Sequence, residues 1–231
     1  MYKRQLYRKA DNANSCRYLG MDAHALETYV NQLMPIASNC YAIHHCNGIY
    51  ISLPYLYDDY MCADSEAEYY SNAILIGHEI IHGFDIDGSL YDWQGERKDW
   101  WTPEDRERFE ALCKRVEDYY NRTECAPGLR CNGALNNGED VADMGGLRLA
   151  LSAAGKKAEF DYDAFFRCYA QKFALLFSRS GFDQVLYNDP HAINRVRINP
   201  LYALVDEFYE TYGIAEGDGM YVPPDERVRV W

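Results

Sequence analysis

The chain has 231 residues, of which 48% are hydrophobic and 26% are charged, so it can form one large domain with a buried core. Its formal net charge of −13 argues against a nucleic-acid partner, because phosphate binding requires clustered Lys and Arg. No run reaches the roughly 18 apolar residues that span a bilayer, so we expect no membrane contact from this segment. Neither an internal repeat nor a Gly/Ser linker interrupts it, and a single domain over residues 1–231 is predicted.

Helical and extended patterns alternate in the first half of the chain. Apolar residues at helical spacing predict a helix over 22–34, and Pro35 ends it. Residues 47–57 have the turn residues, and then the β-branched and aromatic residues, of a turn followed by a strand. Residues 65–84 predict a long helix that starts acidic, becomes apolar and stops at Gly83 and the turn-rich segment 85–88.

The second half is mostly helical in pattern. Thr102 and Pro103 are a good N-cap and first helical residue, and they predict a helix over 102–120. A loop rich in Cys, Gly and Asn is expected over 121–138. Further helices are expected at about 139–154, 161–179 and 203–213, before an extended tail from 221. The predicted class is therefore mainly α with a small β-sheet, an α+β fold.

Eight cysteines leave the redox compartment open. An even number is compatible with disulfides, and Cys125 and Cys131 could close a small loop. The absence of a Cys-x-x-Cys pair argues against a zinc ribbon or a thioredoxin-type site.

The central chemical signal is His78-Glu79-Ile80-Ile81-His82. Residues four apart lie on one face of a helix, so both imidazoles can reach a single metal ion. Glu79 then projects beside the first ligand, where it can take a proton from the attacking water. The alternative is a pair of core histidines satisfied by hydrogen bonds.

A catalytic zinc needs a third protein ligand and one open position. Glu139 and Asp143 are also four apart on a predicted helix, so their carboxylates face the same way. One can bind the metal while the other holds the second nitrogen of a histidine. The alternative is a solvated acidic helix start, favoured by the helix dipole.

The chain resembles the carboxy-terminal catalytic region of the neprilysin (M13) family of zinc metallopeptidases over nearly its whole length. Five ordered segments carry this resemblance: Ile-Gly-His-Glu-x-x-His-Gly-Phe-Asp at 76–85, Asp-Trp-Trp-Thr at 99–102, Gly-Glu-x-x-Ala-Asp-x-Gly-Gly-Leu at 138–147, Asp-Pro-His at 189–191 with an arginine at 197, and Met-Tyr-x-Pro-Pro-Asp-x-Arg-Val-x-x-Trp at 220–231.

The resemblance implies a zincin, thermolysin-like catalytic domain in which the helix with the two histidines packs beside the Glu-x-x-x-Asp helix. It implies one zinc ion on His78, His82 and Glu139, with oligopeptides as substrates. It also implies catalytic roles for Glu79, Asp143 and His191: Glu79 activates the water, and His191 and the zinc stabilise the oxyanion. Family habit suggests a location outside the cytoplasm, in a secreted or membrane-anchored enzyme.

Arg197 has the donors to hold a substrate carbonyl, and an internal salt bridge is its alternative role. By the resemblance, Asn39 and Cys40 lie on the substrate-binding strand, where the family's asparagine grips the substrate backbone. An edge strand can pair with a peptide through backbone groups, so the unusual Cys40 is compatible with binding.

Three features depart from the family pattern. His44, His45 and Cys46 could form a second metal site, although a surface turn is favoured. Tyr55, Tyr60 and the segment Ala-Gln-Lys-Phe at 170–173 predict a more polar pocket for the residue after the cut. We also expect the family's amino-terminal helical lid to be missing from residues 1–35, which would expose apolar surface.

Two other classes of function compete with the peptidase. One is an inactive relative that keeps the fold as a zinc-containing binding module. The other is a structural zinc protein, whose metal would be closed by four protein ligands, with His191 as a candidate for the fourth.

Overall fold

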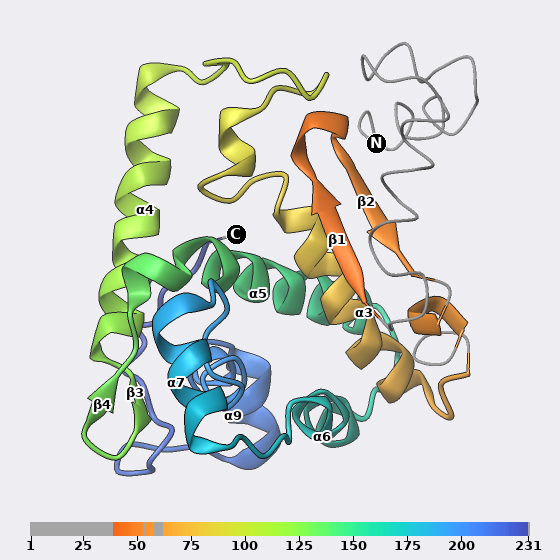
Figure 1. The fold of residues 1–231 in the computed structure, drawn as a ribbon. Helices are drawn as coiled ribbons and strands as arrows, with labels where there is room; N and C mark the ends of the chain where they lie inside the picture. The colour runs from red at the N-terminus through yellow and green to blue at the C-terminus, as the bar shows by residue number, and fades with distance from the viewer. Residues whose placement is uncertain (1–38, 53, 58–61, 231) are drawn as a thin grey trace.

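The computed structural model describes residues 39–52, 54–57 and 62–230 (Figure 1). They form a mainly helical fold with two small antiparallel sheets, each of two strands. The strands and 3-10 helices are β1 (Cys40–Ile43), η2 (His44–Cys46), β2 (Gly48–Ile51), η4 (Gly88–Leu90), β3 (Glu124–Ala126) and β4 (Leu129–Arg130). The α-helices are α3 (Glu66–Ile81), α4 (Pro103–Arg122), α5 (Gly133–Ala154), α6 (Tyr162–Lys172), α7 (Arg179–Asn188), α8 (Asn199–Tyr202) and α9 (Asp206–Tyr212).

Helices α3 and α5 cross at two buried glycines, Gly77 and Gly146. A Cβ added to Gly146 would lie 2.6 Å from the carbonyl oxygen of Ile74 and 2.7 Å from the backbone nitrogen of His78. A Cβ added to Gly77 would lie 3.0 Å from the Cα of Gly146. Backbone therefore lies directly on backbone at this crossing, which is why residues of α5 can reach the histidines of α3.

This contact predicts opposite effects for two Gly→Ala changes in α5. Gly146→Ala should lower the free energy of unfolding by about 1–3 kcal/mol, because the new methyl meets backbone that cannot rotate away. Gly138→Ala meets only ordinary contacts, the nearest at 3.5 Å, and should gain up to about 1 kcal/mol from helix propensity. Urea unfolding of both variants tests this, and equal effects would contradict the close crossing.

The hairpin of β1 and β2 packs along α3 (Figure 1). Its register runs from Cys40 opposite Ile51 to Ile43 opposite Gly48. The reversal is made by η2 and by Asn47, whose φ of 47° is in the left-handed region that asparagine tolerates better than most residues. The fold thus places one strand of this hairpin next to the helix with the two histidines.

The core surrounds α5, with α4 near one end of this helix, α6 near the other and α9 between them (Figure 1). Aromatic rings fill much of it, and Tyr120, Phe165, Phe166 and Tyr169 are among the largest fully buried side chains. Part of the high tyrosine content is therefore structural. A hydroxyl that finds a partner makes this burial tolerable, as Tyr202 does by donating to the carbonyl of Phe166 at 2.8 Å.

Most predicted helices in the described region are confirmed: α3, α4 and α9 lie within the expected ranges 65–84, 102–120 and 203–213, apart from two extra residues at the end of α4. The helix expected at 22–34 lies outside the described residues. The strand expected over 47–57 is too long, because it ends at Ile51 and residues 54–57 are helical. There Ser52 turns the chain, as its hydroxyl accepts the N–H groups of Asn39 and Tyr55.

Two helix boundaries were wrong. Helix α5 begins at Gly133 and not near 139, because the side chain of Asn132 caps it by accepting the N–H of Leu135 at 3.1 Å. The helix expected at 161–179 ends at Lys172, and α7 begins after Ser178, which caps it. The apolar residues between these helices extend the helical pattern in the sequence, but Leu175 and Leu176 are exposed.

The cysteines whose side chains are described are free thiols. Cys125 and Cys131 are both buried at the β3–β4 hairpin and do not form the small disulfide loop that their spacing allows. Burial and the neighbouring Cys125 raise the pKa of the Cys131 thiol to about 12. This thiol is therefore protonated at neutral pH.

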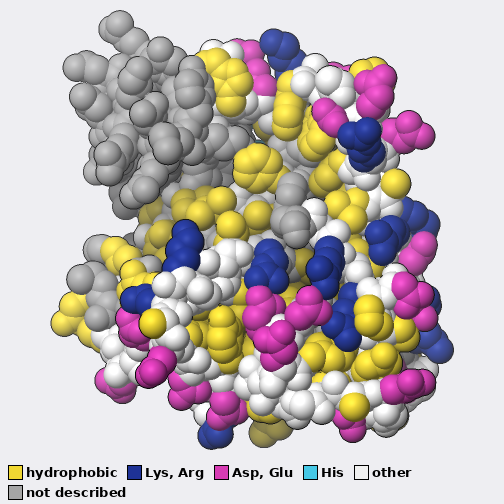
Figure 2. Space-filling model, turned by 180° about the vertical axis from the view of Figure 1, so that it is seen from behind, with side chains coloured by type: hydrophobic (Ala, Val, Ile, Leu, Met, Phe, Trp, Pro, Cys, Tyr) yellow, Lys and Arg dark blue, Asp and Glu magenta, His cyan; other side chains and the backbone are white. Residues whose placement is uncertain are grey.

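Figure 2 shows one face of the molecule, on which acidic and basic side chains are interspersed among apolar ones. Opposite charges that lie so close together largely cancel each other's field. Among the described helices, none combines the length and apolar character that crossing a membrane requires.

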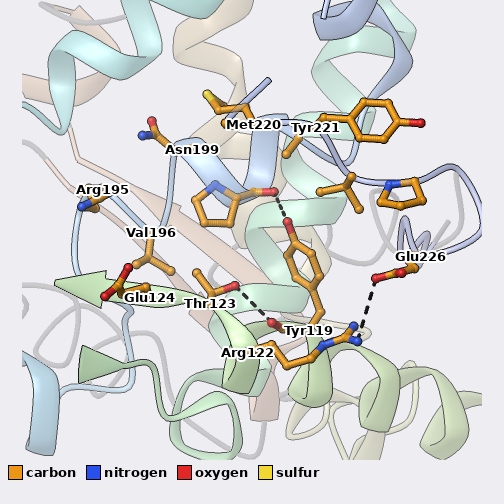
Figure 3. A pocket seen from close by; sticks show the side chains of 15 residues that line it. Tyr119, Arg122, Thr123, Glu124, Arg195, Val196, Asn199, Met220, Tyr221 and Glu226 are labelled. Atoms are coloured by element: carbon orange, nitrogen blue, oxygen red, sulfur yellow. Dashed lines mark hydrogen bonds and ion pairs between the residues drawn. The ribbon is translucent and has the colours of Figure 1, made fainter. Parts of the chain in front are cut away.

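A surface pocket of about 420 Å³ lies between the end of α4 and the carboxy-terminal segment (Figure 3). Some of its polar groups bind one another: Tyr119 donates to the carbonyl of Pro200 at 2.8 Å, and Arg122 lies 3.9 Å from Glu226. None of the predicted metal ligands lines it. The chemistry predicted from the sequence therefore belongs to a different part of the molecule.

Candidate metal centre

Helix α3 presents His78 and His82 one turn apart, with their Nε2 atoms 2.9 Å from each other. The Nδ1 of His78 contacts Asp143 Oδ1 at 2.7 Å, and the Nδ1 of His82 contacts Asp85 Oδ2 at 2.5 Å. An ionised carboxylate can only accept, so each Nδ1 carries the hydrogen. In the neutral rings, both Nε2 lone pairs therefore point into the same space.

Glu139 on α5 completes this group. Its Oε2 lies 3.1 Å from the Nε2 of His78 and 3.4 Å from the Nε2 of His82. The three ligand atoms lie within 4.8 Å of one another, and no other such cluster occurs among the side chains that the structure describes. The two helices thus aim two imidazoles and one carboxylate at a common point.

The arrangement fits a bound cation. Two lone pairs and a carboxylate at these distances repel each other unless a positive charge lies between them. Burial lowers the pKa of His82, but hydrogen bonds to Asp85 and Glu139 outweigh it and raise the pKa to about 10. The site therefore attracts positive charge, and two imidazoles with one carboxylate are a ligand set typical of zinc.

Asp143 links the histidine of α3 to an arginine from a distant segment. Its carboxylate accepts from Nε and Nη2 of Arg197 at 2.8 and 2.7 Å, as well as from His78. Burial raises the pKa of the Asp143 carboxyl, but Arg197 and His78 outweigh it and hold the pKa well below its ordinary value. Asp143 therefore stays ionised and fixes the orientation of His78.

Arg197 makes the internal salt bridge that was its alternative role. Its guanidinium also lies over the ring of Phe173, at 4.9 Å from the centroid. Nε and Nη2 are bound to Asp143, which leaves Nη1 outside this pair. The internal salt bridge is therefore made by Nε and Nη2 alone.

Sequence reasoning missed the role of Asp85, which it treated as part of the turn after the helix. Its Oδ2 holds His82, while its Oδ1 accepts the N–H groups of Asp87 and Gly88 at 2.9 and 2.7 Å. The spacing of three residues after His82 was the available signal, because it permits a contact over one turn. Each histidine of the cluster is thus oriented by its own aspartate.

Glu79 lies on α3 beside His78 and is buried. Burial raises the pKa of its carboxyl, although His78 and His82 act in the opposite direction. A carboxylate with a raised pKa is a better proton acceptor than an exposed one. Glu79 therefore combines a place next to the cluster with the basicity that a general base needs.

His191 reaches the cluster from the loop after α7. Its Nε2 lies 3.1 Å from Glu139 Oε2, and its Nδ1 contacts Asp189 Oδ1 at 2.8 Å. Its ring is nearly parallel to that of His78, with the centroids 6.4 Å apart. The Nε2 of His191 is not among the three ligand atoms that lie within 4.8 Å of one another. A zinc ion held by these three ligands alone would keep a coordination position open, as catalytic sites do.

Asn39 and Cys40 lie at the start of β1. The side-chain amide of Asn39 donates to the hydroxyl of Tyr41 at 2.9 Å, and Cys40 is buried. The predicted surface turn at 44–46 is confirmed as η2. Among the described side chains, His44 is not one of the clustered metal-ligand candidates, and its ring stacks on that of Tyr91 with the centroids 5.5 Å apart.

The predicted polar pocket is described only in part. Tyr55 is buried and its hydroxyl donates to the carbonyl of Asn72. The Nζ of Lys172 lies 6.0 Å from the centre of the Tyr55 ring. Tyr60 lies outside the described residues. An amine and a tyrosine are thus neighbours on the side of α3 that faces α6.

The helix with the His-Glu-x-x-His motif, packed against a second helix that carries a glutamate, defines the fold and site of the zincin class. The family model for peptidase family M13 matches residues 39–228, and the chain belongs to this family.

The similar proteins are peptidases by name. The chain is 35% identical over 167 residues to a neutral endopeptidase of Lactococcus lactis, covering 72% of this chain and 26% of the relative. It is 29% identical over 171 residues to neprilysin-2 of Drosophila melanogaster, covering 68% and 22%. The chain thus spans about a quarter of the length of these curated relatives.

Two solved structures of peptidases are also similar to the chain. The zinc metalloprotease Zmp1 of Mycobacterium tuberculosis, in complex with an inhibitor, matches with a TM-score of 0.78 and 29% identity, covering 86% of this chain and 33% of that one. PepO of Lactobacillus rhamnosis matches with a TM-score of 0.75 and 30% identity, covering 84% and 31%. The mainly helical zincin fold expected from the sequence is confirmed.

Proposed function

We propose that this chain is the catalytic part of a zinc-dependent endopeptidase that hydrolyses peptide bonds in oligopeptides. The observation that carries the proposal is the convergence of His78 Nε2, His82 Nε2 and Glu139 Oε2 on one point, with the buried Glu79 beside it. Two imidazoles and one carboxylate are the ligand set of catalytic zinc in metallopeptidases. Membership of peptidase family M13 agrees with this function.

When bound, zinc would polarise the substrate carbonyl and lower the pKa of water, so that hydroxide forms near neutral pH. Glu79 takes the proton from the attacking water and later delivers it to the leaving amine. Asp85 and Asp143 keep the Nδ1 hydrogens of the two histidines in place, so that both Nε2 atoms remain available as ligands.

His191 donates from Nε2 to the oxyanion that develops on the carbonyl oxygen. Asp189 supports this donation, because it holds the Nδ1 of the same ring at 2.8 Å. Burial lowers the pKa of His191, but contacts with Glu139 and Asp189 outweigh it and raise the pKa. Because Nδ1 gives its hydrogen to Asp189, Nε2 carries a hydrogen only when the ring is protonated, and the raised pKa favours this form.

Substrate binding is proposed for Asn39, Cys40 and Arg197. Arg197 would use Nη1 for a substrate carbonyl, while Nε and Nη2 stay on Asp143. Residues 39–40 open the strand β1, whose backbone groups could pair with an extended peptide. In the whole protein, we propose a location outside the cytoplasm, which rests on the family resemblance.

We also propose that an amino-terminal lid covers the site in the whole protein. The relatives named above are much longer than this chain, and the region that matches it makes up 22–33% of their length. Leu175, Leu176 and Phe177 form an exposed apolar segment between α6 and α7. Such a segment is suited to contact with another part of a larger protein.

Removal of the metal tests the function. We expect one zinc ion per chain, and peptide cleavage that stops when a chelator such as 1,10-phenanthroline removes it. One equivalent of Zn²⁺ should restore cleavage, whereas Mg²⁺ should not, because Mg²⁺ prefers oxygen ligands in octahedral geometry. Metal analysis and a fluorogenic peptide assay measure both. Cleavage that persists in zinc-free protein would exclude the proposal.

A further inference from the structure

The loop that carries His191 is fastened to α5 by a side chain with no role so far. Asn136 lies in α5 one turn before Glu139, and it is buried. Its Nδ2 donates to the carbonyl oxygens of Asp189 at 3.2 Å and Pro190 at 2.8 Å. These are the two residues that precede His191, so a single amide binds the backbone on which this imidazole is mounted.

The same two residues also set the direction of the ring. The carboxylate of Asp189 accepts from the backbone N–H of His191 at 2.9 Å and holds its Nδ1 at 2.8 Å. The opposite nitrogen, Nε2, then reaches Glu139 Oε2 at 3.1 Å. Residues three apart on a helix lie on one face, so α5 binds the His191 loop at Asn136 and meets the His191 ring at Glu139.

We propose that Asn136 is a positioning residue for catalysis, because it fixes the distance between His191 and the metal cluster. This inference rests on the proposed function of His191 in stabilising the oxyanion. A donor must lie within about 2.7–3.1 Å of the oxyanion, so a small shift of the loop costs much of its effect. Without the Asn136 amide, the carbonyls of Asp189 and Pro190 lose the bonds that hold them to α5.

The chain offers a matched control in the next residue. Asn137 is also 5% exposed, as Asn136 is, and its Nδ2 donates to one backbone carbonyl, that of Cys113 at 2.8 Å. That carbonyl belongs to α4, which carries none of the proposed catalytic residues. Asn136→Ala and Asn137→Ala therefore remove the same buried group from the same helix, but only the first releases the His191 loop.

We expect Asn136→Ala in the zinc-loaded protein to lower kcat for a peptide substrate about 10- to 100-fold, with little change in KM, because positioning of an oxyanion donor acts in the transition state. Asn137→Ala should change kcat less than about 3-fold. This is a smaller change than the tenfold or greater loss that follows when a residue supporting a metal site is replaced. In a His191→Ala background, Asn136→Ala should have no further effect on kcat, because the residue that it positions is absent.

A second measurement does not depend on cleavage. The ¹H–¹³C signal of the His191 Cε1–H group should shift or broaden in Asn136→Ala and keep its position in Asn137→Ala. If the alanine variant does not fold, Asn136→Leu has a similar shape, lacks any donor and should give the same results. Equal losses of kcat in both alanine variants, an undiminished effect in the His191→Ala background, or an unchanged His191 signal would overturn the inference. Absence of cleavage in the unmodified protein would instead count against the proposed function.

Discussion

Glu79→Gln should lower kcat for peptide cleavage by about 10²- to 10⁴-fold, the usual contribution of a general base. Glutamine keeps the shape of the side chain but cannot accept the proton of the attacking water. Glu79 supplies none of the three ligand atoms of the cluster, so the variant should still bind one zinc ion. Its effect should therefore fall on kcat and not on the metal content.

The matched control is Glu66→Gln, the same change near the start of the same helix, where Glu66 is exposed and paired with Lys157. This variant should keep its activity. Zinc analysis beside steady-state kinetics separates three outcomes. An inactive, zinc-loaded Glu79→Gln supports the enzyme, an active one removes Glu79 from the mechanism, and an unmodified protein that binds zinc without cleaving peptides supports a binding module.

Asp143→Asn should damage both stability and metal binding. Removing one partner from a buried salt bridge costs about 3–5 kcal/mol, because the remaining charge is left buried without compensation. Here that charge is Arg197, whose side chain is only 11% exposed. Asparagine has one acceptor oxygen and no charge, so it holds His78 less firmly and should also weaken zinc binding about 10- to 100-fold. Urea unfolding and a competitive zinc titration measure the two effects separately.

Asp85→Asn is the comparison for this variant. Asp85 holds His82 as Asp143 holds His78, but it has no arginine partner among the described residues. We expect a similar loss of zinc affinity with a smaller loss of stability. Equal stability losses in the two variants would contradict the role assigned to the pair of Asp143 and Arg197.

The salt bridge also predicts a dependence on pH. The pKa of Asp143 is lower in the folded protein than the value of about 3.9 for an unperturbed aspartate. Its stabilising contribution is therefore complete above about pH 5 and is lost as the pH falls below about 4, towards the folded pKa. The difference in unfolding free energy between the metal-free protein and Asp143→Asn should shrink as the pH falls below about 5, and urea unfolding in a series of acidic buffers measures it.

Residue spacing and capping patterns predicted the structure correctly where all the residues concerned lie in one helix. The spacing of His78 and His82 predicted that both face one way, and α3 shows this. The cap at Thr102 located the start of α4 correctly. The start of α5 depends on tertiary bonds as well as on the Asn132 cap, since Gly133 donates to the side chain of Asn121 and Asn137 to the carbonyl of Cys113. These bonds hold a Gly- and Asn-rich segment in a helix that its own propensity disfavours.

By itself, the sequence determined the helical spacing of the two histidines, the pairing of Glu139 with Asp143 on one face, and membership of peptidase family M13. Each of these depends on residues within a few positions or on whole motifs. Only the tertiary structure decided that Arg197 binds Asp143 and that Asn136 binds the backbone before His191. Both contacts join segments 53 or 54 positions apart. No local periodicity encodes them, because they exist only once α5 is packed against α3 and the loop after α7 lies on α5.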